Sequence, residues 1–270
     1  MPNHVAAYDD AAPSFGCHRG LPEGAAELVR TAVLHVIEPM PRPCLLDVGA
    51  GTGRIGRAFV AAGDDYVGVD LSLGMLREFA RRGAFGSIAD RGSAARLVQA
   101  DGCGLPFRDA AFDAVMLIQV FGGLRGWRRL MEEARRVLRP AGALVLGRIV
   151  APEDGVDARM KRRLSAILGE MGAAPEHGNA RVEVEAWLGA NAAHAARVTA
   201  AAWDAERTPR GFLERHRTGA RFSALPERTK DRSLRSLGEW AAREFGSLDA
   251  KLFERHEFEL GIFRLGQGGR

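Results

Sequence analysis

The stretch that decides the fold reads Leu45-Leu46-Asp47-Val48-Gly49-Ala50-Gly51-Thr52-Gly53-Arg54, an apolar run that meets alternating glycines. The apolar run predicts a buried strand, and residues from about Arg54 to Ala62 predict a helix. Glycines between the two let the backbone turn sharply and come close to a ligand. Because the first N–H groups of a helix attract anions, the turn predicts a ligand-binding site.

Strand and helix patterns alternate on the carboxyl side of this turn. Strands are predicted at Tyr66–Asp70, Leu97–Asp101, Ala114–Ile118 and Ala143–Arg148, with helices at Leu73–Arg81 and Trp127–Leu138. Repeated units of this kind, with strands that are apolar almost throughout, predict a parallel sheet with helices on both faces. The predicted fold class is therefore α/β, a Rossmann-like doubly wound sheet.

The pattern changes after Val150. Helices are predicted at 157–171, 181–191, 208–217 and 230–245, a strand at 196–203, and an edge strand from Phe253 to Phe263. We therefore expect four parts: an N-terminal helical arm (1–40), a ligand-binding core (41–150), a helical insertion or lid (151–195) and the C-terminal part of the same sheet (196–270).

Composition excludes several classes of protein. The 270 residues are 46% apolar, enough for one large domain with a lid, and the net charge of +4 gives little support for nucleic-acid binding. Cys17, Cys44 and Cys103 lack the spacing of a zinc site, so we expect a reducing compartment and no metal. The start of the sequence has no signal-peptide pattern, and no segment approaches the roughly 20 apolar residues of a membrane span. We expect a cytoplasmic enzyme that does not bind membranes.

Two cofactor classes could use the glycine turn. Gly51, Gly53 and Gly56 match the dinucleotide pattern, with an acid at Asp70. S-adenosylmethionine is favoured by Asp47, because a carboxylate there would attract an α-ammonium group and repel a pyrophosphate. Two further features favour S-adenosylmethionine. Roughly forty residues precede the turn, and a further acid, Asp101, ends the third predicted strand, where it suits the adenine amino group.

The sequence resembles the class I S-adenosylmethionine-dependent methyltransferases, particularly the group that includes ubiquinone and menaquinone C-methyltransferases. The resemblance runs from about Tyr8 to Val150 and rests on the glycine turn and on four later blocks, Val67–Leu76, Gln99–Phe107, Ala111–Val115 and Arg136–Leu144. It implies S-adenosylmethionine as cofactor and a seven-stranded sheet whose final strand is antiparallel.

The resemblance also implies roles for individual residues. Asp47 and the turn of Gly49, Ala50, Gly51, Thr52 and Gly53 would hold the methionine moiety, Asp70 the ribose hydroxyls, and Leu71 and Met75 one face of adenine. Asp101, Gly102 and Cys103 would cover the amino edge of adenine, and Gln119, Val120 and Phe121 would lie beneath the sulfonium and ribose. Tyr8, Phe15 and Arg19 match a looser family feature, in which an arm folds over the cofactor and the arginine lies near the methionine carboxylate. A solvated arm whose aromatic residues pack on the first helix, predicted around Leu28 to Ile37, is the alternative.

The acceptor is expected to be a small molecule. The Asp/Asn-Pro-Pro-aromatic block of enzymes that methylate exocyclic amines of nucleic acids is missing after Ile118, and the basic stretch from Arg207 to Arg221 is interrupted by acids. An RNA-directed methyltransferase and a non-catalytic cofactor-binding protein remain as alternatives. Methyl transfer needs alignment more than a base, so the catalytic residues stay unknown. His177, His194, His216 and His256 are interpreted as surface or packing residues.

Overall fold

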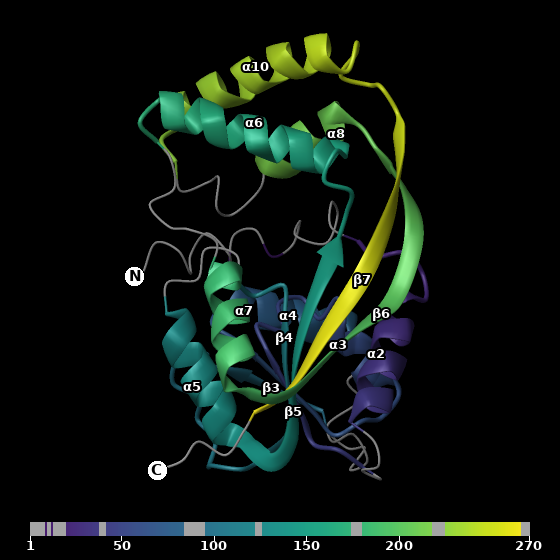
Figure 1. The fold of residues 1–270 in the computed structure, drawn as a ribbon, viewed down its shortest axis with the longest axis vertical. Helices are drawn as coiled ribbons and strands as arrows, with labels where there is room; N and C mark the ends of the chain where they lie inside the picture. The colour runs from purple at the N-terminus through teal and green to yellow at the C-terminus, as the bar shows by residue number, and fades with distance from the viewer. Residues whose placement is uncertain are drawn as a thin grey trace.

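The computed structural model of the chain describes residues 9, 12, 20–37, 42–83, 95–121, 126–173, 180–217 and 225–265. One sheet runs through them (Figure 1). Its strands are β1 (Leu45–Val48), β2 (Tyr66–Asp70), β3 (Arg96–Gln99), β4 (Phe112–Ile118), β5 (Leu138–Val150), β6 (Ala192–Arg207) and β7 (Leu252–Leu265). The helices are α2 (Ala25–Val36), α3 (Gly56–Ala61), α4 (Leu73–Arg82), α5 (Trp127–Val137), α6 (Val156–Glu170), α7 (Ala180–Asn191), α8 (Pro209–Arg217) and α10 (Glu227–Glu244).

The seven strands lie in the order β3-β2-β1-β4-β5-β7-β6. Strands β1 to β5 pair in parallel, and β7 pairs antiparallel with both β5 and β6. The predicted α/β class, with seven strands and an antiparallel final strand, is confirmed. After β3, at one edge of the sheet, the chain crosses to β4 on the other side of β1. The direction in which strands are added to the sheet therefore reverses between β1 and β4. In doubly wound sheets, ligands bind at such a point.

The sequence prediction for β7 was wrong in one respect, because β7 lies inside the sheet and β6 forms the edge. Side chains of β7 alternate between buried and partly exposed, from Glu254 to Ile262, whereas most of β6 is at least partly exposed. A final strand inserted between two earlier ones depends on contacts distant in sequence. Its hydrophobic alternation alone therefore did not distinguish an inner strand from an edge strand.

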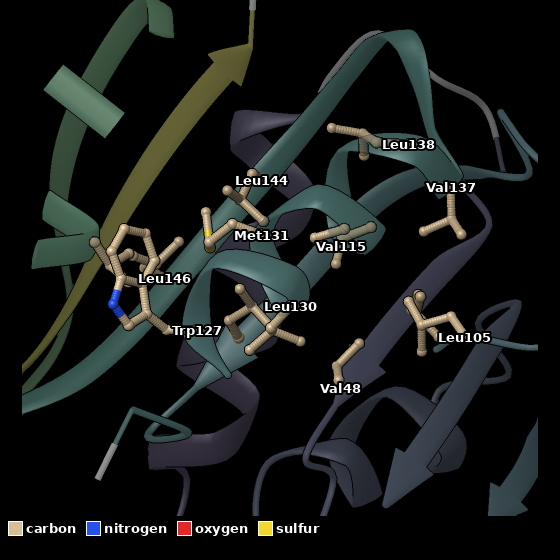
Figure 2. Packing of buried hydrophobic residues seen from close by; sticks show 14 of the residues in the cluster. Val48, Leu105, Val115, Trp127, Leu130, Met131, Val137, Leu138, Leu144 and Leu146 are labelled. Carbon is tan, nitrogen blue, oxygen red and sulfur yellow. The ribbon is translucent and has the colours of Figure 1, made fainter. Parts of the chain in front are cut away.

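Two hydrophobic cores cover the faces of the sheet. On one face α5 and α7 pack on the strands, and Figure 2 shows Leu130 and Met131 of α5 beside Val115 and Leu144. The inner residues of α5 recur at helical spacing, which gives the helix its apolar face. On the other face α2 and α3 pack on residues that include Leu45 of β1. Strands β1 and β4 are consequently buried on both sides, while β3 at the edge stays partly exposed.

Helices α6, α8 and α10 form a separate layer with its own core. Buried residues of this layer include Met160 of α6, Phe212 of α8 and Leu237 of α10. Figure 1 shows the layer beyond the carboxyl end of β5, reached by the upper parts of β6 and β7. The two helices of the segment 151–195 thus lie in different places, since α7 packs beside α5 against the sheet. None of the described helices is both long and apolar enough to cross a bilayer.

Candidate cofactor site

Backbone hydrogen bonds bring the strand ends together at the glycine turn. The amides of Gly49 and Ala50 both donate to the Val69 carbonyl, at 2.8 and 2.9 Å. The Ala100 amide donates to the Asp70 carbonyl at 3.1 Å. The turns after β1, β2 and β3 therefore lie side by side at the carboxyl edge of the sheet.

The glycines of the turn have different structural roles. Gly49, Gly51 and Gly53 all have left-handed backbone, with φ of +80, +56 and +74°. A Cβ added at Gly49 would lie 2.8 Å from the Val120 side chain, and one at Gly53 would lie 2.1 Å from the Phe79 ring. At Gly51 the nearest atom to such a Cβ is a backbone oxygen at 3.9 Å, so this glycine borders open space. The turn can thus bring its backbone close to a ligand at Gly51 and at the exposed Gly49, where a side chain would also meet Val120, while Gly53 serves internal packing.

Asp47 lies beneath the turn and is 3% exposed. Its carboxylate accepts a 2.6 Å hydrogen bond from the hydroxyl of Tyr66, the first residue of β2. Burial raises the pKa of Asp47 to about 6, and the Tyr66 hydrogen bond opposes that rise. The site therefore holds an acidic group that a neighbouring cation would readily keep ionised.

Asp70 ends β2 and closes the side of the turn. Its carboxylate accepts the Gly51 amide at 2.8 Å and the Ser72 amide at 2.9 Å. Burial raises its pKa, and these two amides act in the opposite direction. Leu71 is 48% exposed, while Met75 on α4 is buried. A carboxylate with an exposed apolar side chain beside it suits a ribose diol next to a base.

The turn after β3 carries the next acid. The carboxylate of Asp101 is exposed and accepts the Cys103 amide at 2.8 Å. A Cβ on Gly102 would lie 2.9 Å from both Leu130 and Val48, so packing requires glycine there. Burial raises the pKa of the Cys103 thiol, which therefore fits the wall of a site better than the role of nucleophile.

The end of β4 completes the site. Gln119 has a left-handed backbone, φ +57°, and its amide donates to the Gly147 carbonyl at 2.9 Å. Its side-chain oxygen accepts a hydrogen bond from Arg54, which directly follows the glycine turn. Val120 packs on Gly49, and Phe121 is buried. The sequence pattern predicts no role for Arg54, and only the folded chain reveals its position beside Gln119.

Sequence reasoning also gave no role to Asp9. Its carboxylate accepts hydrogen bonds from the Ser72 hydroxyl and from the Gly74 amide, the latter at 2.8 Å. These bonds hold Asp9 of the N-terminal arm at the start of α4. Its partner Ser72 directly follows Asp70 and Leu71 in the sequence. Tyr8 and Arg19, which were predicted to contact the cofactor, lie outside the described residues, as does Phe15.

The described residues His194, His216 and His256 lie on β6, α8 and β7, not on the elements that carry the glycine turn. His194 is exposed on β6, and the ring of His216 stacks on Phe212 with centroids 3.8 Å apart. Burial lowers the pKa of His216 to about 4. His256 is buried on β7, and His177 lies outside the described ranges. In the described part of the chain, no group of three or more His, Cys, Asp or Glu is placed to hold a metal ion.

These residues fit S-adenosylmethionine better than a dinucleotide. A pyrophosphate at the turn would meet the Asp47 carboxylate, whereas an ammonium would be attracted by it; Asp70 suits a ribose diol in either cofactor. Gly56, the third glycine of the dinucleotide pattern, is explained by packing, because its Cβ would lie 2.2 Å from the Tyr66 hydroxyl. Thr52 is buried, Ala50 half-buried and Gly49 exposed, so the open part of the turn extends from Gly49 to Gly51.

Comparison with known proteins shows the family to which the chain belongs. A family model described as a methyltransferase domain matches residues 46–146. A demethylmenaquinone methyltransferase of Parafrankia is 31% identical over 221 residues, which cover 75% of this chain and 87% of the relative. The chain belongs to the class I S-adenosylmethionine-dependent methyltransferases.

The methyltransferase shares its fold with the YcgJ protein of Bacillus subtilis. That structure has a TM-score of 0.56 and 19% identity, and the match covers 89% of this chain and 99% of the other. Another relative, the demethylmenaquinone methyltransferase of Renibacterium salmoninarum, is 32% identical over 156 residues. The match covers 57% of this chain and 62% of that relative, so it spans less than two thirds of its length. As a member of this family, the methyltransferase uses S-adenosylmethionine as its cofactor.

Proposed function

We propose that this methyltransferase methylates a small molecule of the quinol or hydroxylated aromatic class, of the kind named for its demethylmenaquinone relatives. The observation that carries the proposal is the extent of the Parafrankia match. It runs over 221 residues, whereas the methyltransferase domain itself covers residues 46–146. The similarity therefore includes parts of the chain beyond the cofactor-binding core, where acceptor specificity is expected to be determined.

In this proposal the described site holds the cofactor from one end to the other. Asp47 and the turn around Gly51 face the methionine moiety, and Asp70 receives the ribose hydroxyls. Leu71 and Met75 cover one face of adenine. The turn of Asp101, Gly102 and Cys103 lies at the adenine edge, and Gln119, Val120 and Phe121 lie beneath the ribose and sulfonium. Tyr8 and Arg19 would close the site from the N-terminal arm.

The reaction proposed is an in-line displacement. S-adenosylmethionine supplies an electrophilic methyl group on a sulfonium, and transfer leaves a neutral thioether. The protein's part is to align the acceptor atom with that methyl and to exclude water, and alignment contributes about 7–11 kcal/mol in well-oriented reactions. No charged group of the protein has to react, so a site of backbone, apolar walls and carboxylates suffices.

The acceptor is proposed to bind between the carboxyl edge of the sheet and the α6, α8 and α10 layer. Open α/β sheets bind ligands at this edge, and the layer lies beyond it (Figure 1). The segment 151–195 supplies α6 to that layer. Two of its described acids have partners: Asp157 pairs with Arg215, and Glu183 accepts from the Trp127 indole at 2.9 Å. For a phenolic acceptor, loss of the proton to water is the proposed route, because methyl transfer needs alignment more than a base.

The experiment uses purified protein and S-adenosylmethionine labelled in the methyl group. It compares a short-chain demethylmenaquinol, a simple 1,4-naphthoquinol and total RNA as acceptors. We expect labelled product from one of the quinols and none from RNA. Asp70→Asn serves as the control and should reduce transfer to every acceptor, because it weakens the ribose contact. Label found in RNA and in neither quinol would refute the proposal and support an RNA-directed enzyme, whose binding should weaken steeply with salt.

A further inference from the structure

The side chain of Arg54 joins two elements of the cofactor site. The residue directly follows Gly53, and its guanidinium donates to the side-chain oxygen of Gln119 at the end of β4. The same two elements meet again where Val120 packs against Gly49. A cationic group therefore lies between the glycine turn and β4, at the methionine end of the site.

Among the described residues, this end also holds Arg57, which donates to the Gly53 carbonyl at 3.2 Å, and two acids. Asp47 lies under the turn and Asp70 beside it, and both are largely buried. The methionine moiety of the cofactor carries a carboxylate as well as an ammonium, and carboxylates next to that carboxylate would repel it. Arg129, by contrast, donates to the Cys103 carbonyl at the turn after β3, which is the adenine side of the site.

We propose that Arg54 binds the carboxylate of the cofactor's methionine moiety and that Gln119 is a positioning residue that holds the guanidinium there. This inference rests on the assignment of S-adenosylmethionine as cofactor. A guanidinium has five N–H donors in a planar fork, so it can bond to an amide oxygen and a carboxylate together. The left-handed backbone of Gln119 and its bond to Gly147 fix the point from which the amide reaches Arg54.

Two ligands that differ in the amino-acid group test the Arg54 contact apart from the other cofactor contacts. S-adenosylhomocysteine carries the amino-acid carboxylate, whereas 5′-methylthioadenosine has the same adenosine and thioether without any amino-acid group. We expect Arg54→Gln to weaken binding of S-adenosylhomocysteine about 10- to 100-fold, as for the loss of a charged hydrogen bond, and to leave 5′-methylthioadenosine unchanged. Isothermal titration calorimetry measures both dissociation constants, and no turnover is needed.

Further variants test the geometry. Arg54→Lys keeps the charge but not the fork, so its loss should be intermediate. Gln119→Asn tolerates a left-handed backbone but shortens the reach of the amide, and it should weaken S-adenosylhomocysteine several-fold without affecting 5′-methylthioadenosine. Arg235→Gln, an exposed site on α10, controls for the loss of one positive charge and should change neither constant.

The inference is overturned if Arg54→Gln binds S-adenosylhomocysteine within twofold of wild type, or if it weakens both ligands equally. It is also overturned if Arg19→Gln produces the selective loss and Arg54→Gln does not, because Arg19 would then hold the carboxylate. If Arg54→Gln does not fold, an unchanged Arg54→Lys affinity for S-adenosylhomocysteine would count against the proposal. A wild-type protein that binds 5′-methylthioadenosine but shows no preference for S-adenosylhomocysteine would refute the carboxylate contact while leaving the cofactor assignment intact.

Discussion

The hydroxyl of Tyr66 donates a 2.6 Å hydrogen bond to the carboxylate of Asp47, and both side chains are buried beneath the glycine turn. Tyr66 also stacks on Phe59 of α3, with ring centroids 5.8 Å apart. The carboxylate is thus held in place by a residue of the next strand. Because burial raises the pKa of Asp47 to about 6, the folded protein without cofactor loses stability when this group ionises.

Asp47→Asn removes a group whose pKa of about 6 in the folded protein lies above the ordinary value of 3.8. The folded state binds this proton more tightly, so the group's contribution is greatest below about pH 4 and is lost as the pH rises to about 6. The Tyr66 hydroxyl can still donate to an asparagine. We expect the variant to be about 1–3 kcal/mol more stable than wild type at about pH 7.5, with little difference near pH 4.

Urea unfolding of the cofactor-free proteins at the two pH values measures this effect. Tyr66→Phe is the matched variant, because loss of the hydroxyl removes a bond that lowers the pKa of Asp47 and should enlarge the pH dependence. A stability difference between Asp47→Asn and wild type that is the same at both pH values would contradict the raised pKa.

Gly51→Ala and Gly53→Ala should separate the ligand contact from packing. Both positions have positive φ, which costs alanine about 1–2 kcal/mol. At Gly53 the new methyl would also collide with Phe79, so we expect a further loss of about 1–3 kcal/mol in stability. At Gly51 there is space, so we expect the larger effect on cofactor affinity. Thermal unfolding and calorimetry with S-adenosylhomocysteine distinguish the two, and a reversed order of stability would contradict this assignment.

Glu254 anchors the α6 end of the separate helical layer to β7. Its carboxylate accepts the Val156 amide at 2.6 Å and lies 3.2 Å from the ring of buried His256. Glu254→Ala leaves both groups without this partner, and we expect a loss of about 1–3 kcal/mol. Glu254→Gln can still accept from the amide and should lose less. Urea unfolding checks this, with Glu257→Ala on the other face of β7 as control; equal losses for Glu254→Ala and the control would refute the anchor.

The bond between Asp9 and Ser72 should hold the N-terminal arm at α4. We expect a double-mutant cycle of Asp9→Ala and Ser72→Ala to give a coupling free energy of about 0.5–1.5 kcal/mol. Asp9→Ala should also speed proteolytic cleavage near the N-terminus, because the Gly74 bond is lost as well. Additive losses, together with unchanged cleavage rates, would show that the arm is held by other contacts.

Local patterns predicted most elements of the fold. The periodicity of the strand at Tyr66–Asp70 and of the helix beginning at Trp127 gave these elements nearly to the residue, because their apolar faces are read from neighbouring positions. The inner position of β7 was missed, because it depends on which distant strands it pairs with. The sequence likewise did not indicate that α6 and α7 pack in different layers.

The sequence by itself determined the α/β class, the glycine turn and the acids at the strand ends, since spacing along the chain carries that information. Only the tertiary structure decided which glycine borders open space, that Tyr66 holds Asp47, and that Arg54 reaches Gln119. Those relationships join residues of different strands and turns. They follow from packing of the sheet, which brings together side chains that no local pattern relates.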